Sequence, residues 1–209
     1  STGGGITYQW QSSPDNSTWT DITNVNTNID YLNLTSTTYY RAVVRSGVCA
    51  DSNSASAVVT VVPAPTVGTI SAPSTTLCNT NSMIVTLTSS SNGVISWEVS
   101  NNSGSSYSAA VGSSNSLTYT IPAGTAAGTY IYRARVTGTS PCTSVISNTV
   151  TVTVSSASIG GNVSPLSTVV CSSGNSGVLT LSGQNGNVVK WQSSPDNFVT
   201  PGNITDITN

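Results

Sequence analysis

The stretch ISWEV, residues Ile95–Val99, indicates the fold class of this chain. Apolar and polar side chains alternate in it, so an extended strand would place Trp97 and its apolar neighbours on one side. The stretch YRARV, Tyr132–Val136, alternates in the same way. A strand with one apolar side is typical of a sheet whose inner face is buried, and we expect Trp97 to lie in that core.

Seven such runs follow one another around ISWEV, each short and rich in Val and Thr or alternating in polarity. Clusters of Ser, Asn, Gly and Pro separate them, and no segment keeps a helical period. The runs lie near 67–72, 83–89, 93–100, 106–111, 115–121, 129–137 and 147–154. Seven short strands at this spacing predict an all-β protein with an immunoglobulin-like antiparallel β-sandwich.

The cysteines show that this unit is repeated. Cys49 and Cys142 are 93 positions apart, and Cys78 and Cys171 are also 93 positions apart. A period of about 93 residues corresponds to one β-sandwich per repeat.

The seven residues WQSSPDN occur twice without change, at 10–16 and at 191–197. Together with the cysteine spacing, they divide the chain into the C-terminal part of one repeat at 1–63, a complete repeat at 64–156 and the N-terminal part of a third repeat at 157–209. These are called the first, middle and third repeats below. The joints are short, so we expect tandem sandwiches in an elongated rod.

The duplicated motif divides into a core residue and a turn. The tryptophans of the strands are predicted to be central core residues of the three repeats. They are Trp10, Trp97 and Trp191. SSPDN has the composition of a tight turn, and SNNSG (Ser100–Gly104) takes its place in the middle repeat.

Composition excludes several classes of function. Only 6% of the residues are charged, the net charge is −2, and the five basic residues form no patch, so neither nucleic acid nor membrane insertion is expected. The chain has no histidine, and its seven acids are dispersed, which argues against an enzyme, a metal site or a cofactor; calcium remains an alternative. Instead, Glu98 could pair with Arg133 and Arg135 across neighbouring strands.

The cysteines are more consistent with disulfides in an exported protein than with a metal or redox site. Pairing Cys78 with Cys142 inside the middle repeat is favoured, with Cys49 and Cys171 pairing outside this chain. The rival scheme joins Cys49 to Cys78 and Cys142 to Cys171 across the joints.

Beyond these patterns, the order of GVLTLSG (Gly177–Gly183), VVKWQSSPDN (Val188–Asn197) and TTYYRAVVRSGVC (Thr37–Cys49) resembles the Ig-like repeats of large Bacteroidota surface adhesins, with SprB-type gliding-motility adhesins as the nearest members. The resemblance spans the chain, although the middle repeat departs from it in WEVSNNS. It implies type IX secretion, an extracellular location at the cell surface, and a structural or adhesive role without catalytic residues.

Two functions follow as expectations. The first is a stalk or filament segment that spaces or presents an adhesive region, with neighbouring repeats, surface glycans or other filament subunits as partners. The alternative is a carbohydrate-binding or spacer module of a secreted polysaccharide-degrading enzyme. In that case Trp19 is the candidate sugar contact, because it lies just past the turn and the third repeat lacks a matching tryptophan.

Overall fold

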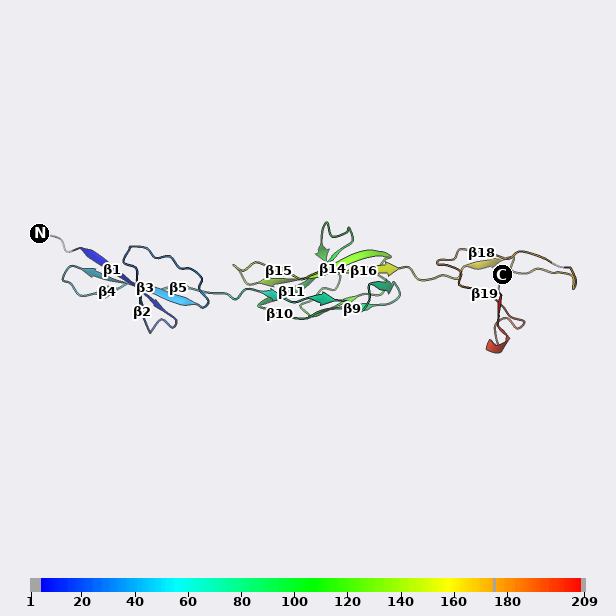
Figure 1. Ribbon diagram of the computed structural model, residues 1–209, viewed down its shortest axis with the longest axis horizontal. Helices are drawn as coiled ribbons and strands as arrows, with labels where there is room; N and C mark the ends of the chain where they lie inside the picture. Colours follow the sequence, from blue (N-terminus) through cyan, green and yellow to red (C-terminus); the bar gives the residue numbers. More distant parts are fainter. Residues whose placement is uncertain (1–4, 175, 208–209) are drawn as a thin grey trace.

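The computed structural model describes residues 5–174 and 176–207, and it confirms the all-β prediction. Apart from one 3-10 turn, η1 (Pro201–Asn203), every regular element in these residues is a β-strand. Figure 1 shows three groups of strands that follow one another in chain order, with β1–β5 first, β6–β16 next and β17–β20 last. Among the described residues, no helix has the length and hydropathy needed to cross a membrane.

The middle repeat holds the most complete set of strands. They are β6 (Thr66–Val67), β7 (Ile70–Ser71), β8 (Thr76–Cys78), β9 (Met83–Leu87), β10 (Ser90–Ser91), β11 (Gly93–Ser100), β12 (Ser108–Ala109), β13 (Thr118–Ile121), β14 (Gly128–Gly138), β15 (Val145–Ile146) and β16 (Val150–Ser155). One sheet has the order β12-β11-β14-β16-β8, with β15 also paired to β14, and the other has the order β13-β9-β7. A short pair, β10-β6, lies beside them.

All of these pairings are antiparallel except that of β16 with β8. The predicted run at 67–72 is followed by Pro73, which has no backbone N–H to donate to a sheet. After it the chain leaves the sheet of β7, and β8 joins the other sheet parallel to β16. This crossing between sheets was not predicted, because β8 has only three residues and is too short to show an alternating pattern.

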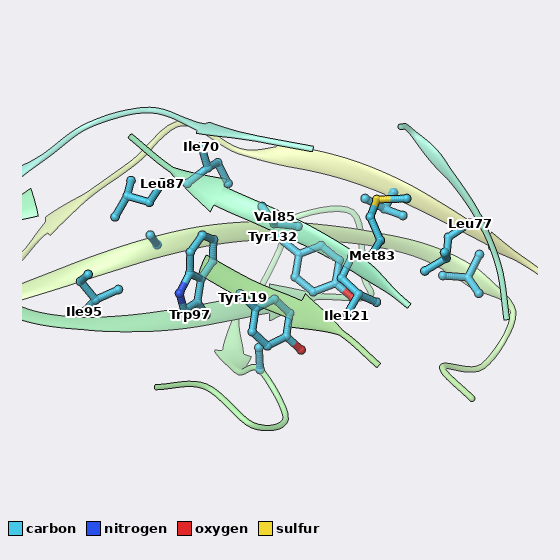
Figure 2. Close-up of a cluster of buried hydrophobic side chains, with 14 of the residues drawn as sticks. Ile70, Leu77, Met83, Val85, Leu87, Ile95, Trp97, Tyr119, Ile121 and Tyr132 are labelled. Atoms are coloured by element: carbon cyan, nitrogen blue, oxygen red, sulfur yellow. The ribbon is translucent and has the colours of Figure 1, made fainter. Parts of the chain in front are cut away.

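The core lies between the two sheets of the middle repeat. Trp97 on β11 is 0% exposed and stacks on Tyr119 of β13, with ring centroids 5.7 Å apart and an interplanar angle of 27°. Figure 2 shows Trp97, Tyr119 and Tyr132 side by side, with Val85 nearby. The inward faces expected from ISWEV and YRARV are confirmed, since Ile95, Trp97, Tyr132, Ala134 and Val136 are buried and Val99 is partly buried against the same core.

The first and third repeats have fewer strands in the described residues. The first contains β1 (Ile6–Ser13), β2 (Thr20–Ile22), β3 (Thr38–Ser46), β4 (Ser52–Asn53) and β5 (Ala57–Val59) in one sheet of order β2-β1-β3-β4, with β5 also paired to β3. The third contains two separate pairs, β17 (Asn162–Ser164) with β18 (Thr180–Ser182), and β19 (Trp191–Ser193) with β20 (Thr205–Ile207). The first and third repeats therefore each contain part of the sandwich seen in the middle repeat.

Candidate interaction surface of the repeats

The three predicted core tryptophans have different surroundings. The indole N–H of Trp97 donates to the carbonyl of Ser116 over 3.0 Å inside the core. Trp10 and Trp191 are only half-buried, and the indole N–H of Trp10 donates to the carbonyl of Asn26 over 3.0 Å. Trp97 alone of the three is enclosed by two complete sheets.

The turn that follows Trp10 is built around the carboxylate of Asp15. Its Oδ1 atom accepts hydrogen bonds from the Ser13 hydroxyl at 2.9 Å and from the backbone N–H groups of Ser17 and Thr18 at 2.9 and 2.7 Å. These bonds, above all those from the two N–H groups, hold the pKa of Asp15 well below its usual range. Asn16 adopts a left-handed φ of 59°, a conformation that asparagine tolerates.

The other two repeats also place a hydrogen-bond acceptor two residues after a serine, the third with the same SSPDN sequence and the middle with SNNSG. In the third repeat Asp196 accepts from the Ser194 hydroxyl at 2.5 Å and from the Thr200 N–H at 3.2 Å. In the middle repeat the amide oxygen of Asn102 accepts from the Ser100 hydroxyl at 2.8 Å and from the Ser106 N–H at 3.0 Å. The prediction that SNNSG replaces SSPDN as the turn is confirmed. The carboxylates serve the turn itself, as acceptors of its own N–H and O–H groups.

Trp19, the candidate sugar contact, lies just past this turn and is half-buried. The Arg41 guanidinium on β3 lies 4.1 Å from the centre of its ring, at cation–π distance. Arg41 Nε also donates to Gln11 Oε1 at 2.8 Å, and Gln11 Nε2 donates to Asp21 Oδ1 at 2.7 Å. Trp19 is therefore part of a network that crosses β1, β2 and β3.

The middle repeat contains the counterpart of this network. The Arg133 guanidinium lies 3.5 Å from the centre of the Tyr107 ring, and Arg133 Nε donates to Glu98 Oε2 at 2.6 Å. Arg135 Nε donates to Glu98 Oε1 at 2.6 Å and Arg135 Nη1 donates to Ser144 Oγ at 3.0 Å. The predicted pairing of Glu98 with both arginines is confirmed.

Partial burial works against the charge on Glu98, but the hydrogen bonds from Arg135 and Arg133 outweigh it and lower the pKa of Glu98. In the third repeat Gln192 Nε2 donates to Asp206 Oδ1 at 2.8 Å, just as Gln11 donates to Asp21. Lys190 Nζ lies 3.1 Å from the same carboxylate. A polar network at one cross-strand position thus recurs in all three repeats.

The cysteine positions overturn the favoured disulfide. Cys78 pairs in register with Ser155, beside the Gly128 end of β14, because Val154 pairs with Gly128. Cys142 lies at the other end, where a Cβ built on Gly138 would be 3.3 Å from the Cys142 Cβ. Ten residues of strand separate these ends by about 33 Å. A disulfide requires Cα atoms within about 7 Å, so the predicted bridge between Cys78 and Cys142 is wrong, and both are thiols here.

The rival scheme fails for a related reason. Cys49 follows the Ser46 end of β3, whereas the chain leaves the first repeat after β5, which pairs at the Thr38 end. Cys49 therefore lies at the end of the first repeat that is farther from the joint with the middle repeat. Cys78 likewise lies at the end of the middle repeat that is farther from this joint. Cys142 lies at the entrance to the middle repeat, where its Sγ contacts the Val62 carbonyl oxygen at 3.4 Å, and the third repeat begins past the opposite end.

Sequence reasoning did not reveal the arginine–aromatic stacking. The sequence pattern that could have indicated it is that Trp19 and Tyr107 both follow the turn, while Arg41 and Arg133 both follow a strand tyrosine. Within 5–174 and 176–207, no three Cys, Asp or Glu side chains gather as metal ligands would. The chemistry of this surface is therefore that of a hydrogen-bonded, aromatic-lined sheet face.

These sheets and this core define a protein of antiparallel β-sandwich class. The chain belongs to the family described as Domain of unknown function (DUF8696), whose profile matches residues 1–63, 66–156 and 159–209. No curated protein matches the sequence. A crystal structure of the FN1–FN3 domains of chicken CNTN1 is similar over 83% of this chain, with 12% sequence identity and a TM-score of 0.33. This chain spans 64% of that one, which is less than two thirds of its length.

Proposed function

We propose that this chain is a non-enzymatic structural segment of an extracellular cell-surface or filament protein, in which tandem sandwiches space or present an adhesive region. The observation that carries the proposal is the recurrence of one architecture along the chain. The turn acceptor is Asp15, Asn102 or Asp196 in successive repeats, and each accepts bonds within its own repeat. Repetition of a self-contained unit extends a chain at low cost in new interactions.

The resemblance to Ig-like repeats of Bacteroidota adhesins supports a more specific proposal, namely adhesion or gliding motility in a protein exported by type IX secretion. Mechanical continuity in such a protein requires well-packed units joined by short linkers. The middle repeat supplies the first requirement with its buried core around Trp97, and the short segments near 62–65 and 156–161 are consistent with the second.

Small-angle X-ray scattering on the full chain tests the rod. A compact protein of this length has a radius of gyration of about 17 Å. Three units in a row should give a value well above that, together with the cross-section scattering of a rod. A radius of gyration near the compact value would contradict the proposal.

Carbohydrate binding, the alternative function, depends on Trp19. The ring is half-exposed, as a sugar contact requires, but Arg41 already lies over it at 4.1 Å. Tyr107 has the same relation to Arg133, which is the arrangement expected if the aromatic ring is a structural partner of the arginine. A glycan array comparing the full chain with Trp19→Ala distinguishes the two functions. Specific binding that Trp19→Ala abolishes would favour the alternative, and unchanged signals would favour the structural role.

A further inference from the structure

The joint between the first and middle repeats has almost no free backbone. A single stretch of chain leads from the first group of strands to the second (Figure 1). On the side of the first repeat, the Val61 N–H donates to the Thr37 hydroxyl oxygen over 3.2 Å. On the side of the middle repeat, the Cys142 Sγ atom contacts the Val62 carbonyl oxygen at 3.4 Å. Two consecutive residues are therefore held by different repeats.

The middle repeat also binds the residues that follow. Asn92 Nδ2 donates to the Ala64 carbonyl oxygen over 3.1 Å. Pro65 is buried, and a Cβ built on Gly138 would lie 2.8 Å from its Cδ atom, so the proline ring occupies the space that this glycine leaves. Pro63 and Pro65 have fixed φ angles, which removes further freedom from the joint. The chain is thus bound to the middle repeat before β6 begins.

The joint between the middle and third repeats is anchored in the same way. The carbonyl oxygen of Ser155, the last residue of β16, accepts a hydrogen bond from the Asn79 N–H over 2.9 Å within the middle repeat. The carbonyl oxygen of Ala157 accepts from Asn185 Nδ2 of the third repeat over 2.6 Å. Only Ser156 separates the two anchored residues. This joint therefore also lacks a free linker.

The side-chain bond from an asparagine is common to both joints. Asn92 and Asn185 are 93 positions apart, and so are the alanines whose carbonyl oxygens accept from them, Ala64 and Ala157. Each asparagine belongs to the repeat that follows its joint. Donor and acceptor thus recur together at the repeat period, which is expected if the bond has a role in every joint.

We propose that neighbouring repeats are coupled rigidly, and that Asn92 and Asn185 are positioning residues that hold the incoming chain on the middle and third repeats. The orientation of one repeat is then passed on to the next, because no flexible linker separates them. The coupling goes beyond the proposed function and is tested separately from it, since a structural segment could also have hinged joints.

Cys142 provides a reporter for the first joint, because its sulfur lies against Val62. In the full chain with the other three cysteines replaced by serine, the rate of alkylation by N-ethylmaleimide measures how often the joint opens. Asn92→Gly removes the donor and suits the left-handed φ of 56° at this position. The loss of one hydrogen bond should raise the alkylation rate roughly threefold to tenfold.

Two variants serve as controls. Asn185→Gly removes the corresponding donor at the second joint and should leave the Cys142 rate unchanged. Asn92→Asp keeps the size and tolerates the same φ, but it places an acceptor where the donor was, so it should react at least as fast as Asn92→Gly. Unchanged amide exchange in β11 and β14 verifies that the middle repeat stays folded. A wild-type rate in Asn92→Gly, or an equal rise in Asn185→Gly, would overturn the role of Asn92.

Distance distributions between spin labels test the rigid coupling itself. With all four native cysteines replaced by serine, labels are attached at Thr20→Cys and Ser108→Cys, two exposed sites in the first and middle repeats. We expect a narrow distribution. Inserting Gly-Ser-Gly-Ser between Val61 and Val62 separates the two anchors and should broaden it markedly. A distribution without the insertion that is as broad as with it would show hinged joints and overturn the coupling, while the proposed structural role would stand.

Discussion

One polar side chain organises the turn after each strand tryptophan, and its chemistry differs between repeats. Asp15 and Asp196 use a carboxylate, whereas Asn102 uses an amide oxygen. The common requirement is an acceptor two residues after a serine, Ser13, Ser100 or Ser194, whose hydroxyl bonds to it. At this scale the turn requires an acceptor at this position and does not require the SSPDN sequence itself.

Substitution of Asn102 tests this requirement in the repeat with the complete core. Asn102→Ala removes the acceptor for the Ser106 N–H and the Ser100 hydroxyl, and should lower the free energy of unfolding by about 1–2 kcal/mol. Asn102→Asp keeps an acceptor and reproduces the other two repeats, so it should cost much less. Urea unfolding followed by fluorescence, with Trp97 as the sole tryptophan of the background, measures both. Equal losses in the two variants would show that the acceptor does not hold the turn.

At the scale of elements, the longest strand pairing of the middle repeat is that of β11 with β14, and it carries the Glu98 network on its outer face. The inner face of the same pair carries Trp97 and Ala134, which are opposite each other in register and both 0% exposed. The pair is therefore fixed on both faces, by packing on one and by charge pairing on the other.

This pairing makes the stability of the middle repeat depend on pH. The pKa of Glu98 is lower in the folded chain than its usual value of 4.5. The stabilising contribution is therefore fully present above about pH 4.5 and is lost as the pH falls through the folded-state pKa. The free energy of unfolding should decrease on going from pH 7 to pH 3.

Glu98→Gln is the matched variant, because it keeps the size and an acceptor oxygen but cannot titrate. It should be less stable than the wild type at pH 7 and should lose less stability between pH 7 and pH 3. Urea unfolding at the two pH values measures the difference. An identical pH dependence in variant and wild type would mean that other carboxylates cause the acid destabilisation.

At the scale of the whole molecule, the buried core is unevenly distributed. Fifteen residues form one cluster in the middle repeat, with Val85, Trp97, Tyr132 and Val152 among them. In the third repeat, strands β17–β20 contain no fully buried residue in the described part of the chain. Regions with few buried apolar contacts open most easily, so the three repeats should differ in local stability.

Amide hydrogen exchange at low protein concentration should show this difference directly. Slow exchange is expected in β9, β11, β14 and β16, and fast exchange in β17–β20. Slow exchange in β17–β20 at low concentration would contradict this uneven distribution of stability.

The amino-acid sequence by itself was sufficient to predict the local features of the structure. Alternation in ISWEV and YRARV predicted the inner faces of β11 and β14, because strand geometry places alternate side chains on opposite faces. The turn at Ser100–Gly104 could be predicted because serine and asparagine bond to nearby backbone. The partners of Glu98 could be predicted because opposite residues on adjacent strands are neighbours.

The tertiary structure decided what spacing along the chain leaves open. The 93-residue interval says that Cys49 and Cys142 are counterparts, but it does not say at which end of a sandwich they lie. That depends on the length of β14 and on the transfer of β8 between sheets after Pro73, which together place Cys78 and Cys142 at opposite ends. The position of Arg41 over Trp19 likewise depends on where the turn brings the ring back onto the sheet. The period of the sequence determines which residues of different repeats correspond. Whether two of them are in contact depends on how the chain folds in three dimensions, and the spacing along the sequence does not give that.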